Sequence, residues 1–393
     1  MSDVLPLKRI AGINERALPE DTHPDREIRY IDISSVGRGR MMAEPEDVRF
    51  EDAPSRARRL VREGDTIVST VRTYLRAVWP VAGATEDLVV STGFAVLTPR
   101  RVDPPYFSWW IRSDVFIEEV VARSVGVSYP AINAVELGNL PVRVPEAKEQ
   151  REIADFLNTE AARIDALITQ KRRMIELLEE RWFAELRKAL DALSGSTVGL
   201  RHIARIKRGQ SPRPIEDPSY FDDDGSHGWV RIEDATRSDV YLNSTRQRLS
   251  PLGKSKSVPV GPGVLLVSIA ASVGNPIITA IECCYHDGWV GLLDLQALPE
   301  FVYLCLVLPE AFGGLGQVGT QANVNSEIVG RISIPYVSIE EQYTFAETML
   351  ASRHQHRHVR SLLEDQIGKL QEHRQALITA AVTGELDVPV VAA

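Results

Sequence analysis

The stretch Glu149-Gln-Arg-Glu-Ile153-Ala-Asp-Phe-Leu157 opens a charged segment with an apolar stripe, and Glu341-Gln-Tyr-Thr-Phe345-Ala-Glu-Thr-Met349 repeats its pattern. The full segments, Glu149 to Leu190 and Glu341 to Val382, align without a gap at one displacement of 192 residues, 341 against 149. An internal repeat constrains a fold more strongly than any local pattern. The chain is therefore predicted to be a duplicated unit.

The repeat extends upstream of both helical segments. Asn133 and Gly138 match Asn325 and Gly330 at the same displacement. Earlier still, Leu7 to Ala11 lines up with Leu200 to Ala204, and Val61 to Gly64 with Val260 to Gly263, after small slips that loops tolerate. Each unit is thus predicted to be a mixed globular region followed by one long helix.

Both helical segments carry one apolar stripe on an otherwise charged rod. Apolar residues recur at spacings of three, four and seven, which is typical of an amphipathic helix. They are Ile153, Leu157, Ile164, Leu167, Ile168, Ile175, Leu178, Trp182 and Leu186, then Phe345, Met349, Val359, Leu363, Ile367, Leu370 and Leu377. About 45 residues at about 1.5 Å each reach roughly 65 Å. We expect the two stripes to pack on each other as an antiparallel coiled coil that holds two globular regions apart.

The globular regions contain candidate strands rich in β-branched and aromatic residues and bounded by Gly or Pro. These are Tyr30 to Ile33, Thr66 to Val71, Phe94 to Leu97, Trp229 to Ile232, Val264 to Ile269 and Trp289 to Leu293. We expect mixed sheets, and hence an α+β fold with an internal pseudo-twofold repeat. The predicted division is globular region 1–145, helix 146–193, globular region 194–338, helix 339–385 and tail 386–393. Pro145 precedes the first helix and Gly384 suits the cap of the second.

Composition bounds the class of protein. With 393 residues, 44% apolar and 25% charged, the chain suits two globular domains and no disorder. It has no run of 18 apolar residues and no apolar signal segment at its start, so we expect a cytoplasmic protein. The cysteines Cys283, Cys284 and Cys305 form no metal or disulfide pattern and are expected to be buried thiols.

Charge is distributed unevenly along the chain. The net charge of −9 argues mildly against a generic polyanion binder. Two basic clusters nevertheless stand out, and each is equally well a solvated face. They are Arg56, Arg58, Arg59 and Arg62, and Arg201, Arg205, Lys207, Arg208 and Arg213.

The chain resembles the specificity (S) subunits of type I restriction-modification systems. The likeness rests on the alternation of two globular regions with two helices, on the helix-entry pattern Pro145 to Leu157 and on its continuation Ala162 to Arg181. The closing segment Leu370 to Leu386 is also similar to that of the family. The likeness covers almost the whole chain.

This resemblance implies a non-catalytic DNA-recognition subunit. Each globular region would be a target-recognition domain that reads one half of an asymmetric bipartite site in double-stranded DNA. The helices would set the spacer and dock methyltransferase (M) subunits, two of them, with restriction/translocase (R) subunits as further partners. No cofactor is expected on the chain itself, and S-adenosylmethionine, ATP and Mg are expected on the partners. A rigid rod between two readers sets the half-site spacing geometrically, as in dimeric DNA binders, whose half-sites lie about one helical turn, roughly 34 Å, apart. The spacer length should therefore follow the helix length.

Candidate DNA contacts in the second half centre on the stretch Lys207-Arg-Gly-Gln-Ser-Pro212, which resembles the family's first recognition loop. Arg and Gln can read guanine and adenine edges, and basic residues can neutralise phosphate. A surface loop without DNA contact is the alternative. The candidates are Lys207, Arg208, Gln210, Ser211 and Arg213, followed further along by Ser272, Gln321 and Asn323.

The equivalent loop of the first half, Asn14 to Pro19, has a different chemical character. Different loops should read different bases, so the target is expected to be asymmetric. Other candidates in this half lie after the strand predicted to end near Val71 and before the Asn133 repeat. They are Arg72, Tyr74, Arg76, Ser128 and Tyr129.

Two short motifs raise the alternative of a stand-alone DNA adenine methyltransferase. Asp103-Pro-Pro-Tyr106 has the form of a methyltransferase catalytic tetrapeptide, and Phe312-Gly-Gly-Leu-Gly316 resembles a loop that cradles S-adenosylmethionine. We interpret both as accidental, because the first does not end an apolar strand and the second follows a predicted helix, Phe301 to Leu308, without a downstream acid. The histidines of His354-Gln-His-Arg-His358 share a helix face but lack further ligands for a metal. A helical scaffold that binds only protein is the third alternative.

Overall fold

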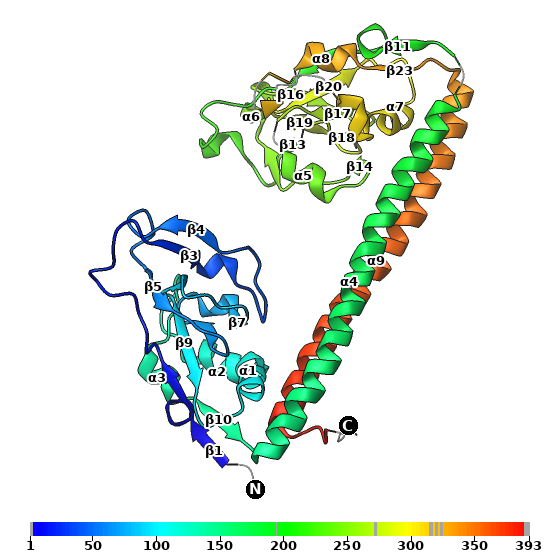
Figure 1. Ribbon diagram of the computed structural model, residues 1–393. Helices are drawn as coiled ribbons and strands as arrows, with labels where there is room; N and C mark the ends of the chain where they lie inside the picture. Colours follow the sequence, from blue (N-terminus) through cyan, green and yellow to red (C-terminus); the bar gives the residue numbers. More distant parts are fainter. Residues whose placement is uncertain are drawn as a thin grey trace. The chain divides into compact units, whose positions relative to one another are not determined.

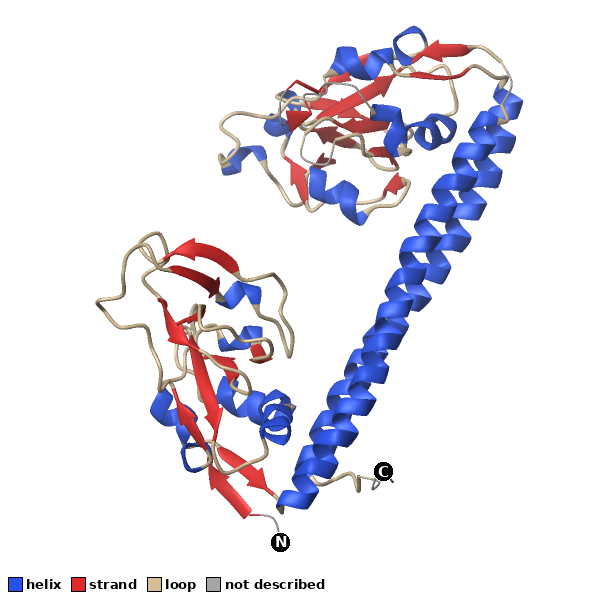
Figure 2. Cartoon of the chain, viewed as in Figure 1, coloured by secondary structure: helices blue, strands red, loops and turns tan. Residues whose placement is uncertain are grey.

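The computed structural model describes residues 3–193, 195–270, 273–313 and 325–388, and the backbone of 317–318 and 321–322. The chain divides into two compact units, residues 1–172 with 364–393, and residues 173–363. Each unit contains one globular region and a part of two 45-residue helices, α4 (Ala147–Asp191) and α9 (Ile339–Thr383) (Figure 1). The strands belong to the globular regions (Figure 2).

The two long helices confirm the predicted repeat. The bounds of α9 are those of α4 displaced by 192 residues, 339 against 147 and 383 against 191. α4 begins two residues after Pro145, and α9 ends directly before Gly384. The φ of Gly384 is +83°, the left-handed cap conformation that glycine adopts at little cost.

Within each unit the two helices run antiparallel. In the first unit Arg374 Nε lies 3.0 Å from Asp165 Oδ1, and Lys171 Nζ donates to Gln366 Oε1 at 2.5 Å. In the second unit Ser352 Oγ donates to Glu185 Oε2 at 3.3 Å, and Arg360 Nη1 lies 3.5 Å from Glu179 Oε1. The contacting residues of α9 have lower numbers as those of α4 have higher ones, so the helices run in opposite directions, as predicted.

The predicted burial of one continuous stripe is only partly correct. Ile164, Ile168 and Leu363 are buried, but Leu167 and Val359 are 40% and 41% exposed. The outer ends of the stripe pack on the globular regions instead. At these ends the apolar side chains of α4 and α9 share a core with the short helices of the globular region. The stripe is therefore not buried by the other long helix alone.

The first globular region contains two four-stranded sheets, in the orders β2-β9-β6-β7 and β4-β3-β8-β5, and a two-stranded sheet β1-β10. The second sheet is mixed, because β3 and β8 are parallel and the other pairs are antiparallel. The strands are β1 Asp3–Pro6, β2 Ala11–Ile13, β3 Glu27–Ile31, β4 Glu46–Arg49, β5 Ala57–Leu60, β6 Thr66–Ser69, β7 Val78–Pro80, β8 Leu88–Ser91, β9 Phe94–Pro99 and β10 Pro141–Val144. The helices are α1 Pro104–Arg112, α2 Asp114–Ala122 and α3 Ala134–Gly138.

The second globular region repeats this frame with the sheets β12-β20-β17-β18-β14, β15-β13-β19-β16 and β11-β23. Strand β14 is an addition, and β13 pairs with β19 in parallel as β3 pairs with β8. The strands are β11 Thr197–Gly199, β12 Arg205–Arg208, β13 His227–Val230, β14 Tyr241–Leu242, β15 Gln247–Leu249, β16 Val258–Val260, β17 Leu265–Ser268, β18 Pro276–Thr279, β19 Cys283–Tyr285, β20 Trp289–Leu293, β21 Gln317–Val318, β22 Gln321–Ala322 and β23 Ser333–Pro335. The helices are α5 Ile232–Arg237, α6 Pro251–Ser255, α7 Pro299–Leu306 and α8 Ser326–Arg331.

The six predicted strands all exist, but several end early. The strand predicted to reach Ile33 stops at Ile31, because Ile33 begins a 3₁₀ turn, and the strand predicted to reach Ile232 stops at Val230, because Ile232 begins α5. The strand predicted to reach Val71 ends at Ser69. Apolar residues continue past each strand end into the core, so the hydrophobic pattern alone overestimates the strand length.

A buried glutamine joins each globular region to its helix in the same way. Gln150 Oε1 accepts from the amide of Asp103 at 2.7 Å, and its Nε2 donates to the carbonyl of Pro145 at 2.7 Å. Gln342 makes the same two bonds in the second unit, to Leu298 at 2.8 Å and Val337 at 3.0 Å. Both glutamines are buried, so the repeated Glu-Gln pair of the sequence marks a structural junction.

Each core combines a globular region with both long helices. The first contains Phe107 and Trp110 of α1, Leu157 of α4 and Ile378 of α9, and the second contains Trp182, Phe301 and Phe345. The three cysteines are buried thiols, as predicted, and burial raises the pKa of Cys283 to about 12. In the described part of the chain no helix is long and apolar enough to cross a membrane.

Candidate nucleic-acid interface

The first candidate surface is the loop Arg72–Arg76, which follows β6. Arg72 and Arg76 adopt left-handed φ angles of +50° and +54°, on either side of a 3₁₀ turn formed by Thr73–Leu75. Non-glycine residues rarely adopt this conformation, and it persists only where the surroundings fix it. Tyr74 and Leu75 lie at the exposed tip.

The segment Ser124–Ala131 lies directly beside this loop. The Arg72 guanidinium lies 4.9 Å from the centre of the Tyr129 ring, and Thr73 Oγ1 donates to Ser124 Oγ at 2.8 Å. Ser128 is exposed, and Tyr129 is 66% exposed. The structure therefore brings Arg72 to Tyr129 and its neighbour Ser128, although Arg72 precedes both by more than 50 residues in the sequence.

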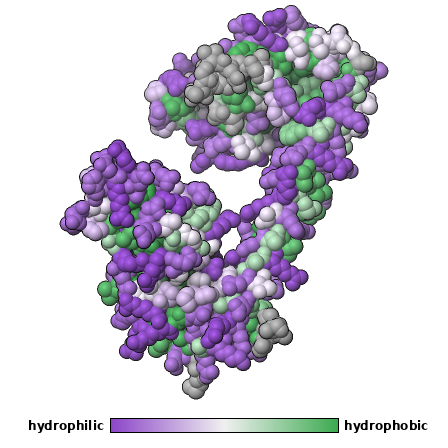
Figure 3. Space-filling model, in the orientation of Figure 1, coloured by the Kyte–Doolittle hydropathy of each residue, from purple (hydrophilic) through white to green (hydrophobic). Residues whose placement is uncertain are grey.

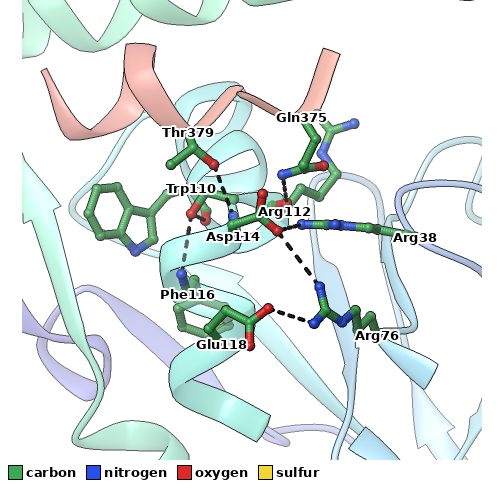
Figure 4. Close-up of polar contacts among 10 residues, drawn as sticks. Arg38, Arg76, Trp110, Arg112, Asp114, Phe116, Glu118, Gln375 and Thr379 are labelled. Atoms are coloured by element: carbon green, nitrogen blue, oxygen red, sulfur yellow. Dashed lines mark hydrogen bonds and ion pairs between the residues drawn. The ribbon is translucent and has the colours of Figure 1, made fainter. Parts of the chain in front are cut away.

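The candidate Arg76 points into a set of carboxylates (Figure 4). Its Nη2 lies 2.6 Å from Glu118 Oε1, and its Nη1 lies 3.9 Å from Asp114 Oδ1. Both acids belong to α2, so Arg76 anchors the loop to that helix. Its charge is largely neutralised within the domain.

The second candidate surface is the segment Lys207–Arg213 at the end of β12. The amide of Gly209 donates to the Trp289 carbonyl at 2.9 Å. A Cβ on Gly209 would lie 2.2 Å from the His286 carbonyl oxygen, so only glycine fits there. Gln210 follows with an exposed side chain, while Ser257 Oγ donates to its carbonyl at 2.6 Å. Lys207 is exposed and forms no ion pair with a described residue.

Asp287 holds this second loop. Its carboxylate accepts from Ser211 Oγ at 2.6 Å and from Arg213 Nη2 at 3.0 Å, and its carbonyl accepts from Arg208 Nε at 2.8 Å. The Ser211 hydrogen bond, and then the Arg213 charge, lower the pKa of the Asp287 carboxyl, which burial alone would raise. Lys207 and Gln210 are thus the side chains of this loop that remain outside the Asp287 contacts.

The equivalent first-half loop, Asn14 to Pro19, is held by a different acid. Asn14 is left-handed, with φ +58°, and its Oδ1 accepts from the Val96 amide at 2.8 Å. Arg16 Nη2 donates to the buried carboxylate of Asp65 at 2.5 Å. By register β12 runs two residues further than β2, because Ile13 pairs with Leu97 and Ile206 with Leu292. The two loops therefore begin at different heights on equivalent strands.

Several residues of the remaining basic clusters make contacts within their own domains. Arg56 lies 3.4 Å from Asp32, and the Arg58 guanidinium lies 4.6 Å from the centre of the Phe50 ring. Arg205 lies 2.9 Å from Asp294. These contacts favour the interpretation of the clusters as solvated faces.

Three predicted contacts cannot be placed in the second half. Ser272 and Asn323 lie outside the described residues, and only the backbone of Gln321 is described, in β22 paired with β21. The segment Gly314 to Gly316 of the glycine-rich motif also lies outside them. These residues remain predictions from the sequence.

The methyltransferase-like tetrapeptide has a structural explanation. Asp103 is the N-cap of α1 and accepts from the Tyr106 amide at 3.1 Å. The Tyr106 ring is fully buried, and its hydroxyl donates to the Arg143 carbonyl at 2.8 Å. Burial raises the pKa of Tyr106. The four residues therefore begin a helix and fix it to β10.

The histidines of α9 also make structural contacts. His356 Nδ1 lies 3.2 Å from the Leu178 carbonyl oxygen, and its Nε2 lies 3.5 Å from Glu185. Among the described residues, no three His, Cys, Asp or Glu side chains are placed to hold a metal ion. The polar-face interpretation of this histidine motif is favoured.

Several residues of these surfaces were not predicted from the sequence. Leu75, Val125 and Val127 are exposed apolar side chains beside Arg72 and Tyr129, at 46%, 80% and 102% exposure. Exposed apolar groups gathered in one place are typical of interaction surfaces. The signal in the sequence is weak, because single apolar residues in loops are common.

Comparison with known proteins identifies similar chains. No family model matches this sequence. A Methanocaldococcus jannaschii protein, described as a type I restriction enzyme MjaX specificity subunit, is 23% identical over 348 residues, which cover 82% of this chain and 77% of the relative. One solved chain, from work on complex assembly and conformational transition of the type I R-M system, covers 98% of both chains with a TM-score of 0.75 and 22% identity. The HsdS subunit of Thermoanaerobacter tengcongensis covers 98% of this chain and 97% of its own, with a TM-score of 0.49 and 21% identity.

The predicted resemblance is thereby confirmed. The chain is similar in sequence to a type I specificity subunit, and it shares its fold with a chain of a type I R-M system. Type I specificity subunits are a class of non-catalytic DNA-recognition subunits.

Proposed function

We propose that this chain is the specificity subunit of a type I restriction-modification complex and that its two globular regions read the two halves of a bipartite DNA site. One observation carries the proposal. The two regions share one sheet frame, but the loops on equivalent strands of that frame differ in length, chemistry and anchoring. A shared frame with different loops suits two readers of different half-sites.

The candidate contacts fall into two kinds. Arg72, Tyr74, Ser128 and Tyr129 form one surface, with Arg76 as its anchor, and basic, aromatic and hydroxyl groups there suit base edges, stacking and phosphates. In the second region Lys207 and Gln210 are exposed. Arg208, Ser211 and Arg213 would shape the loop through Asp287.

The long helices would set the distance between the half-sites and dock the partner subunits. Exposed apolar side chains on them support the docking, because such groups favour protein contacts. They are Leu167, Met174, Leu177, Val359 and Leu362. Figure 3 shows hydrophobic and hydrophilic side chains together along the helices on the face that it draws. Two M subunits, and R subunits beyond them, would bring S-adenosylmethionine, ATP and Mg.

The test is single-molecule mapping of N6-methyladenine in a host with this chain and its methyltransferase partner, compared with a strain that lacks only this chain. We expect a bipartite motif that disappears on deletion. Unchanged methylation would instead favour the protein-only scaffold. A short continuous motif that disappears with this chain would favour a stand-alone adenine methyltransferase.

A further inference from the structure

Asp114, the first residue of α2, meets three separate parts of the first unit (Figure 4). Its carboxylate forms ion pairs with Arg38, which follows the turn after β3, and with Arg76 of the 72–76 loop. Its backbone amide donates to Thr379 Oγ1 of α9 at 3.1 Å. One residue therefore touches a candidate DNA-contact loop and a long helix at the same time.

The neighbouring contacts strengthen the same link. Gln375 Nε2, also on α9, donates to the carbonyl of Arg112 at 3.1 Å, two residues before Asp114. Glu118, one turn further along α2, takes the other end of the Arg76 guanidinium at 2.6 Å. The start of α2 is thus fixed to α9, and the loop is fixed to α2.

We propose that Asp114 is a positioning residue that fixes the 72–76 loop on helix α9 and thereby sets the base discrimination of the first recognition domain. The proposal rests on the proposed function, because it assigns the loop to one DNA half-site. Asp114 itself would not touch DNA.

Two physical arguments support a positioning role over a purely stabilising one. The side chains of Asp114 and Arg76 are both 38% exposed, and ion pairs at such exposure contribute little to folding stability. The loop they fix has left-handed residues at both ends, a conformation that requires external support. Removal of the carboxylate should therefore change the geometry of the loop more than the stability of the fold.

The second unit offers a matched control. Asp239 also joins a recognition domain to α9, through Arg353 Nη2 at 2.7 Å and Arg357 Nη1 at 2.5 Å. Among the residues whose side chains the structure describes, it contacts no candidate DNA residue. Asp239→Asn removes a carboxylate of the same kind without disturbing a candidate reading loop.

The experiment measures kcat/KM for DNA methylation by the complete complex with its methyltransferase subunits. The substrates are oligonucleotides with the cognate site or with one changed base pair in either half. Arg72→Gln and Gln210→Ala identify the halves read by the first and second domains.

For Asp114→Asn we expect cognate discrimination to fall about tenfold in the half affected by Arg72→Gln, and to remain in the other half. Arg76→Gln removes the contacts of the loop with both Asp114 and Glu118, so it should lose at least as much discrimination in the same half. The double variant should lose no more than Arg76→Gln alone, because Asp114 acts on the loop through Arg76. Asp114→Glu should restore most of the discrimination.

The outcomes separate the two proposals. If the wild-type complex discriminates bases in both halves and Asp114→Asn retains that discrimination, or loses it equally in both halves, the positioning role is overturned while the proposed function stands. A loss as large in Asp239→Asn would also overturn it. If the wild-type complex discriminates in neither half, the proposed function itself fails.

Discussion

The two globular regions are alike where they meet the helices and different in the loops on their equivalent strands. Gln150 and Gln342 make the same pair of backbone hydrogen bonds, and the strand orders correspond throughout the two main sheets. The loops after β2 and β12, in contrast, are anchored by Asp65 in one domain and by Asp287 in the other. A duplicated frame can therefore support two readers without requiring that they read the same bases.

The largest effect is expected at the shared junction. Gln150→Ala or Gln342→Ala would remove the two hydrogen bonds that a buried glutamine makes to a partly buried amide and to a nearby carbonyl, at a cost of about 2–3 kcal/mol in the free energy of unfolding. Urea denaturation of the full chain would measure both costs. Equal losses are expected, whereas a loss in only one variant would show that the two junctions are not equivalent.

A smaller and unequal effect is expected at the loop starts. Gly209→Ala places a methyl group against the backbone of β19 and its following turn, and should cost about 1–3 kcal/mol by overpacking. Asn14→Gly keeps the left-handed backbone accessible and removes one hydrogen bond to Val96, which should cost about 1 kcal/mol. Thermal unfolding of the two variants tests this order. A larger loss for Asn14→Gly would contradict the close-packing role of Gly209.

Mild acid should distinguish the two domains. Burial, as the largest cause, lowers the pKa of His227 and of His286, both in the second domain. The unfolded chain, with histidine pKa values near 6.5, then binds these protons first as the pH falls. The free energy of unfolding is therefore highest above about pH 6.5, where both imidazoles are neutral in the folded and the unfolded protein. It decreases as the pH falls through the lowered pKa values of His227 and His286 in the folded protein.

By strand register, the first domain has Ser91 and Thr92 at the positions of His286 and Asp287, so it lacks the counterpart of this buried histidine. Hydrogen exchange of the two domains, compared at pH 7 and pH 5 after correction for intrinsic rates, should show loss of protection in the second domain. The variant His286→Asn should reduce that loss. Equal loss in both domains would refute this assignment.

The smallest effect is expected at the pair of Arg72 and Tyr129. Arg72→Gln removes a contact between a guanidinium and an exposed ring, which contributes about 0.5–1 kcal/mol. We expect a change below about 1 kcal/mol in unfolding free energy but a clear loss of discrimination in one DNA half-site. A large loss of stability instead would make Arg72 a structural residue.

The long helices could be predicted closely from the sequence because their signal is local. Spacings of three and four residues fix which face is apolar, and the predicted stretch Glu149 to Leu190 differs from α4 by two residues at its start and one at its end. The six strands were located for the same reason. Their early ends at Ile31 and Val230 could not be predicted, because the apolar pattern continues into a turn and a helix.

The candidate surfaces depend on contacts between residues far apart in the sequence. Arg72 meets Tyr129, and Ser211 and Arg213 meet Asp287, through sheet pairings that one sequence does not specify. The sequence therefore indicated the basic and aromatic residues of the loops but not the acids that hold them. No local sequence pattern distinguishes Asp287 and Asp114 from the other acidic residues of the chain.

The first unit is built from two separate stretches of the chain, and this affects the order in which the two cores can form during synthesis. The second unit is one unbroken stretch, 173–363, whereas the core of the first includes Ile378, Ala381 and Val382. On the ribosome, the later half of the chain can thus finish its core before the earlier half. The N-terminal domain cannot complete its core until residues 378–382 have been synthesised, so loss of these late residues would damage the beginning of the protein first.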